Sequence, residues 1–308
     1  MPGAIRAAVV AWALAWPCAG GAAERPADVR MAQAPSQAAA PSAAADPWFK
    51  LAPFPEPSEE LLGAVAGGKL YVFAGLAPGW KPRALVYEYD PASNAWTKKK
   101  PMPLPSHHVA VTELDGKIYL FGGFTAPASG PPAWVLIDNA WEYDPATDGW
   151  RALAPMPSRR GAAAAAAVNG KIYAIGGRIG SAFISTASNT DVVEEYDPAT
   201  DRWGALKARM PTPRSAVAWG VHQNRIYVAG GEFQDGRMLA AFRAVEAFDP
   251  ALNRWFTLPQ MPLPRHGLAG GVVGDRLHLV SGDVQSAGTG AHVDVEAHDA
   301  LQLDRVPK

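Results

Sequence analysis

One short string, an aromatic residue followed by Asp-Pro-Ala and then by a tryptophan, occurs four times in this chain. It reads YDPASNAW from Tyr89, YDPATDGW from Tyr143, YDPATDRW from Tyr196 and FDPALNRW from Phe248. A string that returns at a regular interval indicates a protein built from stacked copies of one supersecondary unit. The repeat therefore restricts the fold more than any other feature of the sequence does.

A second string lies upstream of each copy and ends in glycine. It reads KLYVFAG, KIYLFGG, KIYAIGG, RIYVAGG and RLHLVSG, and its final glycines are residues 75, 123, 177, 231 and 282, a period of about 50 residues. Small residues precede the glycine strings, as in GAAAAAAV at 161–168, and Pro-Met-Pro or Met-Pro follows each tryptophan. The unit therefore contains four pieces in a fixed order.

The unit reads as four short β-strands joined by turns, with the small-residue stretch as the first. The KIYxxGG run is rich in β-branched and aromatic residues, which is typical of strands. The Asp-Pro-Ala-Thr-Asp link is a turn, because Pro presets φ and Asp tolerates the left-handed conformation. Helix propensity alone would make 161–168 helical, but its place in the repeat predicts the first of four strands. VEEYD at 193–197 is the third strand, and the tryptophan begins the fourth.

This combination resembles the kelch repeat, which builds β-propellers. The resemblance covers residues 47 to about 299. It implies an all-β fold of five four-stranded blades, or of six if a degenerate blade is present. Small residues of the first strand would fit the narrow central channel, and the repeated tyrosines and tryptophans would pack between blades towards the rim.

Five glycine strings but only four tryptophan strings leave the last blade one strand short. The missing strand matches DPWFKLAPFPEP at 46–57, where Trp48 precedes Pro-Phe-Pro as Trp150 precedes Pro-Met-Pro. We therefore expect an N-terminal strand to complete the last blade. Such closure would cover strand edges that otherwise pair with other chains.

The residues before the propeller indicate export. Arg6, the apolar run 7–16 and the small residues after it form the pattern of a cleaved signal peptide, so residues 1–23 are expected to be removed and the protein to be secreted or periplasmic. Residues 24–45, rich in Ala and Pro, have the composition of a flexible linker, and the propeller domain is 46–308. The apolar run is shorter than the roughly 20 residues that cross a bilayer, so no membrane span is expected.

Composition excludes several functions. The net charge is −1 without a basic block, which argues against nucleic acid as a partner. The single cysteine, Cys18, lies in the expected signal peptide, so the mature chain lacks the Cys–Tyr cross-link of copper-radical oxidases that resemble galactose oxidase. The seven histidines lack a spacing such as HExxH. We expect no metal and no cofactor.

Function is expected on one face of the propeller. Strands alternate in direction, so the loops between second and third strands share a face with the junctions between blades. These loops are long, and long loops on a rigid scaffold commonly carry binding. They are residues 124–139, 178–191, 232–244 and 283–292.

Two rings of residues should surround the channel mouth on this face. The first ring follows each Pro-Met-Pro element, and the second follows each glycine string. The first is Ser58, Ser106, Arg160, Arg214 and Arg265, the second is Leu76, Phe124, Arg178, Glu232 and Asp283, and His107, His108, Arg159 and His266 adjoin the first. The charges fall on the last three repeats, where they could bind an anionic or hydroxyl-rich ligand through charge-assisted bonds. A junction arginine has a structural alternative, because in kelch units it commonly holds loop carbonyls.

Two functions remain. The first is a monomeric, exported binding module that presents its loop face to a protein or a glycan, since no nucleophile–base pair or metal cage is present and a fold alone implies no activity. The second is an enzyme without a cofactor, because the chain resembles in size and layout exported kelch propellers that interconvert the anomers of sialic acid (N-acetylneuraminate epimerase or mutarotase). Such a reaction needs only proton transfers near the sugar ring. Glu232, with Arg214 or Arg178, would be the catalytic pair.

Overall fold

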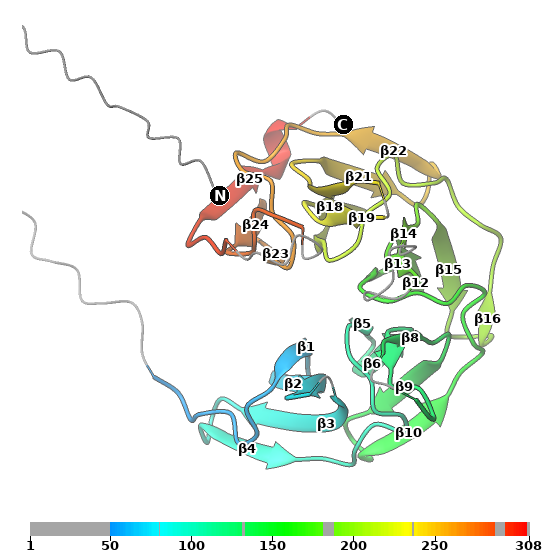
Figure 1. Cartoon of the computed structure of the whole chain (residues 1–308), viewed down its shortest axis with the longest axis vertical. Helices are drawn as coiled ribbons and strands as arrows, with labels where there is room; N and C mark the ends of the chain where they lie inside the picture. Colours follow the sequence, from blue (N-terminus) through cyan, green and yellow to red (C-terminus); the bar gives the residue numbers. More distant parts are fainter. Residues whose placement is uncertain are drawn as a thin grey trace, which may run out of the picture. The chain divides into compact units, whose positions relative to one another are not determined.

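Five antiparallel sheets, formed as the repeat predicts, surround a common centre in the computed structural model (Figure 1). All described residues belong to the compact unit Lys50–Lys308. The structure describes residues 50–79, 81–130, 133–180, 188–235, 237–286 and 293–306. The expected signal peptide, linker and Trp48 strand lie outside these residues and stay predictions.

Four sheets contain four strands each, in sequence order from the centre to the rim. Blade one is β1 (Glu59–Ala66), β2 (Lys69–Ala77), β3 (Lys81–Asp90) and β4 (Ala95–Lys98). Blade two is β5 (Ala110–Leu114), β6 (Lys117–Phe121), β9 (Ala140–Asp144) and β10 (Gly149–Ala152). Blade three is β11 (Ala164–Val168), β12 (Lys171–Ile175), β15 (Val193–Asp197) and β16 (Arg202–Trp203). Blade four is β17 (Ala218–His222), β18 (Arg225–Ala229), β21 (Val245–Asp249) and β22 (Arg254–Thr257).

The fifth sheet has three strands among the described residues. They are β23 (Ala269–Val273), β24 (Arg276–Val280) and β25 (His298–Gln302), followed by a 3-10 turn at Leu303–Arg305. The prediction of an all-β, five-bladed propeller is confirmed. Within the described part of the chain, no helix is long and apolar enough to cross a membrane.

The innermost strands β1, β5, β11, β17 and β23 contact their neighbours in turn. The alanine-rich stretch that propensity would make helical is β11, and Ala164 and Ala165 are fully buried there because alanine suits a crowded inner strand. Trp219 on β17 departs from the expectation of small channel residues. It pairs with Val228, as Ala165 pairs with Ala174 in blade three. The indole of Trp219 therefore occupies the position that the methyl group of Ala165 has in blade three.

The repeated tryptophan string holds the linker that arrives from the preceding blade. In blade three, the indole Nε1 of Trp203 donates to Ala154 O at 2.9 Å, and Ala154 N donates to Asp201 Oδ1 at 2.8 Å. The Tyr196 hydroxyl donates to the same Asp201 oxygen at 2.6 Å. Asp201 has a φ of 52°, the left-handed conformation that Asp and Asn tolerate. The same indole and Asx bonds hold Ala52 in blade one, Lys100 in blade two and Ala208 in blade four.

The repeated glycines allow neighbouring blades to approach closely. Gly177 has a φ of 102°, and its N–H donates to Arg214 O of the next blade at 3.0 Å. A Cβ at Gly176 would stand 2.8 Å from that same oxygen, so a side chain there would push the blades apart. The glycine string therefore joins each blade to the next.

The first described residues take the place of an inter-blade linker. Ala52 accepts from the Trp96 indole at 3.0 Å, as Lys100 accepts from Trp150 in the next blade. Phe54 packs edge-on against Trp96 with ring centroids 5.1 Å apart. This position fits the expected role of the residues just before them as the last strand of blade five.

The long loops of blades two to four are partly ordered as two-stranded ribbons, which the sequence did not predict. The ribbons carry the first residues after the glycine strings, so the second ring stands on regular backbone. They are β7–β8 (Phe124–Thr125 and Val135–Leu136), β13–β14 (Arg178–Ile179 and Ser188–Asn189) and β19–β20 (Glu232–Gln234 and Leu239–Ala241).

Candidate functional site

The three junction arginines of the first ring lie inside their own blades. Arg214 is fully buried, and its guanidinium donates to Glu246 Oε2 at 2.8 Å and to Val228 O at 3.0 Å. Arg160 pairs in the same way with Glu194 and two carbonyls, and Arg265 with Asp299 and two carbonyls. These contacts agree with the structural role considered for junction arginines, in which the guanidinium holds backbone carbonyls of its own blade.

An axial cavity of about 700 Å³ is lined by residues of all five blades. Three charged residues of the second ring, Arg178, Glu232 and Asp283, line it, and so does His266. Leu76 and Phe124 hold the corresponding positions in blades one and two and are fully buried. The structure therefore brings together the charged members of the second ring and separates them from the first-ring arginines.

Backbone pairing sets this arrangement. The residue that follows each first-ring residue forms an antiparallel backbone bridge with a second-ring residue. Ser215 pairs in this way with Glu232, and His266 pairs with Asp283. The bridge carries the second-ring side chain to the cavity. Because the junction arginine lies one residue earlier along the extended backbone, its side chain points to the opposite side, into the blade.

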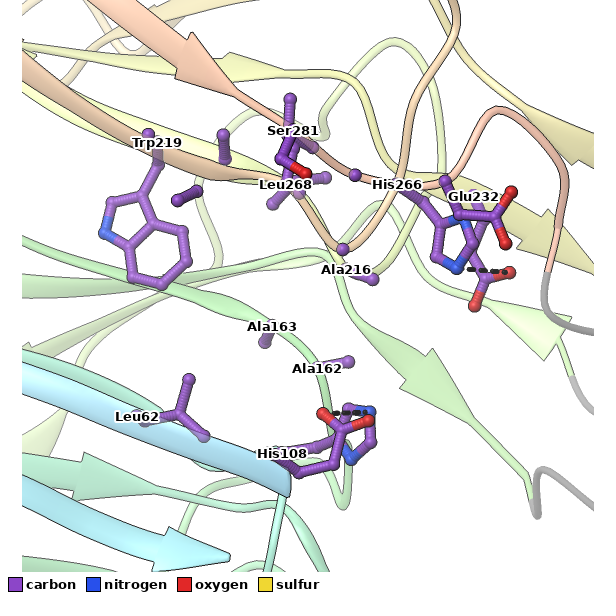
Figure 2. A pocket seen from close by; sticks show the side chains of 18 of the residues that line it. Leu62, His108, Ala162, Ala163, Ala216, Trp219, Glu232, His266, Leu268 and Ser281 are labelled. Atoms are coloured by element: carbon purple, nitrogen blue, oxygen red, sulfur yellow. Dashed lines mark ion pairs between the residues drawn. The ribbon is translucent and has the colours of Figure 1, made fainter. Parts of the chain in front are cut away.

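Glu232 is a buried carboxylate of the site, 2% exposed. Its carboxylate forms an ion pair with Arg178 and accepts from Ser286 Oγ at 2.8 Å. The Nε2 atom of His266 stands 3.9 Å from Glu232 Oε2 (Figure 2). Charge-assisted contacts of this kind fix the carboxylate in one orientation.

A further ring of cavity residues was not identified from the sequence. Its members, here called the inner ring, stand two positions after the first ring and all have left-handed φ values between 51° and 61°. They line the cavity, and backbone N–H groups link four of them in succession at 2.9–3.0 Å. The inner ring is Glu60, His108, Ala162, Ala216 and Gly267. Aligning the five junctions would have shown it, because only blades one and two place polar side chains there.

The two polar members of the inner ring contact each other. Glu60 Oε2 lies 3.2 Å from His108 Nε2, and His108 Nδ1 lies 2.7 Å from His107 Nδ1. Glu60 has the left-handed φ of the inner ring, 56°, while Glu59 and Leu61 on either side of it pair with Leu76 and Ala74 of β2 in continuous register.

His107 lies behind His108 rather than in the cavity lining. Its ring stacks on Phe124 at 5.6 Å and meets Trp134 edge-on at 4.5 Å. Burial lowers the pKa of His107 to about 3, and it lowers the pKa of His108 to about 3 as well. Both imidazoles are therefore neutral at physiological pH.

The cavity carries an excess of negative charge. Four carboxylates line it and face one guanidinium, that of Arg178. Desolvation raises the pKa of Glu60, Glu232 raises it further, and His266 and Arg178 oppose the rise. The carboxylates are Glu60, Glu232, Asp283 and Asp294. No group of three or more His, Cys, Asp or Glu among the described residues is arranged to hold a metal ion.

The opposite wall of the cavity is apolar. Leu62, Trp219 and Leu268 line it, and Figure 2 shows the Trp219 ring apart from both His–carboxylate pairs. The cavity thus offers an aromatic surface on one side and charged hydrogen-bonding groups on the other.

Comparison with known proteins finds a matching family model and curated proteins of similar sequence. Residues 63–282 match the model of the KLHDC2/KLHL20/DRC7 kelch-repeats domain. The Kelch-like protein terF of Aspergillus terreus is 30% identical over 151 residues, which are 46% of this chain and 31% of that protein. Kelch-like protein 35 of Mus musculus is 28% identical over 140 residues, 46% of this chain and 22% of that protein. The chain thus spans about a third or less of these curated relatives.

A solved structure described as "Structure of YjhT" has a similar fold. It superposes with a TM-score of 0.64 at 20% sequence identity, covering 75% of this chain and 74% of the other. At this identity the similarity concerns the fold alone.

Proposed function

The chain belongs to the kelch-repeat family, and from that premise we propose that it is an exported binding module that holds a polar ligand, a glycan or a protein segment, in its axial cavity. The cavity carries this proposal. Its volume of about 700 Å³ lies within the range of roughly 300–1,000 Å³ that is usual for small-ligand sites. Its lining combines an aromatic wall with fixed charged groups, which is the composition of a polar-ligand site.

Export is part of the proposal and rests on the sequence of residues 1–23. Mass spectrometry of the protein released by the producing cells tests it. The expected mature chain begins near residue 24 and carries no lipid. A diacylglyceryl group on Cys18, or an intact N-terminus, would contradict this part of the proposal.

Glycan-array binding by the purified chain from residue 24 onward tests the binding function. We expect one or more glycans to bind, and Trp219→Ala to weaken that binding because it removes the aromatic wall. Melting curves of both proteins serve as the control for folding. If no glycan binds, and if cross-linking on the producing cells captures no protein through the cavity loops, the chain is not the proposed binding module.

The mutarotase alternative is supported by one observation. Glu232 is a buried carboxylate next to an imidazole in the cavity, an arrangement suited to proton transfer. The charge of the cavity counts against it, because a sialic acid carries a carboxylate of its own. NMR of N-acetylneuraminate anomerisation is the test. We expect no acceleration by the protein, whereas an acceleration that Glu232→Gln abolishes would establish the enzyme.

A further inference from the structure

The axial cavity is electrostatically unsuited to an anion. Its lining holds four carboxylates and one guanidinium, and the pKa of the His108 imidazole is lowered to about 3 by burial, so His108 adds no positive charge. A ligand with a positive charge would meet complementary charge here.

His266 offers an acceptor in the same cavity. The residue lines the cavity and is 9% exposed, and among the described residues its Nδ1 has no hydrogen-bond partner. Its Nε2 faces the Glu232 carboxylate at 3.9 Å. In the tautomer that carries its N–H on Nε2, towards the carboxylate, Nδ1 is a hydrogen-bond acceptor. A buried acceptor without a donor points to a ligand that donates.

Arg178 offers the opposite group. Its guanidinium pairs with Glu232, yet its buried Nε has no hydrogen-bond partner in the described part of the chain. This N–H requires an acceptor such as a hydroxyl oxygen. Trp219 supplies an aromatic face to the same cavity (Figure 2). A ligand that carries a donor cation, hydroxyl acceptors and a flat apolar face matches all three features.

We propose that the ligand group in the axial cavity is the ammonium of an amino sugar, with the ammonium among the carboxylates and His266 and the sugar ring against Trp219. This inference rests on the proposed binding function and names its ligand class. A lysine side chain shares the ammonium but lacks the hydroxyl acceptors, and so is the less favoured source.

Calorimetric titration of the chain from residue 24 onward tests the proposal, at a pH chosen from a titration of the free glucosamine trimer so that its amines are protonated. The matched ligands are the glucosamine trimer and the N-acetylglucosamine trimer, which differ in charge only at the amine groups. We expect the glucosamine trimer to bind at least about tenfold more tightly, and added salt to reduce this difference. A lysine amide is titrated as the peptide-like control.

Asp294→Asn and Glu296→Gln form a matched pair of variants. Both residues are exposed on the same segment, but only Asp294 lines the cavity. We expect Asp294→Asn to weaken the glucosamine trimer by about tenfold and Glu296→Gln to leave it unchanged. Equal effects of the two variants would place the cation outside the cavity and overturn the proposal.

The outcomes separate this inference from the function on which it rests. Tighter binding of the acetylated trimer, or of an acidic glycan, would refute the ammonium proposal and leave the binding module standing. Binding of the lysine amide but of neither trimer would refute the amino sugar. If no glycan and no cavity-dependent protein binds, both proposals fail together.

Discussion

Substitution of Asp201 by alanine tests whether the repeated tyrosine–tryptophan string acts as a clamp, that is, whether its hydrogen bonds to the incoming linker stabilise the contact between blades. The carboxylate accepts from the hydroxyl of Tyr196, whose side chain is fully buried, and from Ala154 N of the incoming linker. The hydrogen bond from Tyr196 and then that from Ala154 hold the pKa of Asp201 below its usual range, so the carboxylate is charged and its bonds are charge-assisted.

The expected cost follows from these contacts. Leaving the Tyr196 hydroxyl buried and unpaired costs about 1–3 kcal/mol, and loss of the linker bond costs about 1 kcal/mol. Alanine at a φ of 52° adds about 1 kcal/mol. Asp201→Ala should therefore lower the free energy of unfolding by about 3–5 kcal/mol. Urea unfolding followed by tryptophan fluorescence measures it.

Blade four supplies the matched control. Asn253 has the same left-handed φ and accepts from Ala208 N at 2.8 Å, but its aromatic partner is Phe248, which has no hydroxyl. Asn253→Ala should therefore cost less than Asp201→Ala by about 1–3 kcal/mol. In a Tyr196→Phe background the two alanine variants should become equal. Equal costs in the parent protein would refute the clamp, because they would mean that the buried hydroxyl bond contributes nothing.

Three further predictions concern the ring, its junctions and acid. Trp48→Ala should cost about 3–5 kcal/mol if Trp48 completes the last blade, whereas deletion of 24–44 should cost nothing measurable; superimposable melting curves for wild type and Trp48→Ala would exclude closure. Arg214→Ala should lower the free energy of unfolding by about 3–5 kcal/mol because it leaves a buried carboxylate unpaired, yet it should change ligand affinity less than twofold. Unchanged stability with weakened binding would show that Arg214 binds the ligand. The pKa values of His107 and His108, lowered to about 3, mean that the unfolded chain binds more protons below about pH 6.5. Stability should fall from there towards pH 3 by up to about 1.4 kcal/mol per pH unit for each imidazole, and His108→Asn should reduce the slope measured by urea unfolding.

The sequence predicted the blades because repetition overrules local preference. The stretch 161–168 favours a helix by propensity, but its position in the repeat assigns it to a strand, and β11 confirms this. The rim packing of tyrosine and tryptophan is confirmed as well, with Tyr143 and Tyr196 fully buried. Which groups the tryptophan indole would bond was not predictable, because the linker that it holds comes from another repeat.

The site was less predictable, because side-chain direction depends on backbone pairing. Arg178 of the second ring and Arg214 of the first ring were both expected at the channel mouth, yet Arg178 lines the cavity and Arg214 is buried within its blade. The backbone bridges decide this: Arg178 itself pairs with Gly161, whereas Arg214 precedes Ser215, which pairs with Glu232. Glu60 lines the cavity from a residue with a φ of 56°, a backbone conformation that no residue pattern indicated. Trp219 stands in a run of small residues that was expected to fit a narrow channel without room for a bulky side chain.

The most direct test of the binding site fills the cavity without changing its charge. Gly63 lines the cavity, and its pairing with Val72 matches that of Trp219 with Val228, so a side chain at residue 63 would project towards the same space. A Cβ there would meet its nearest neighbour, Leu70 Cδ1, at an ordinary 3.4 Å. The measurement is the affinity of Gly63→Trp for the glycan selected on the array, with Gly63→Ala as the control for the backbone. We expect Gly63→Trp to weaken binding by at least about tenfold and Gly63→Ala to leave it intact, with both variants melting near the parent protein. Unchanged affinity in a folded Gly63→Trp protein would contradict the axial cavity as the binding site.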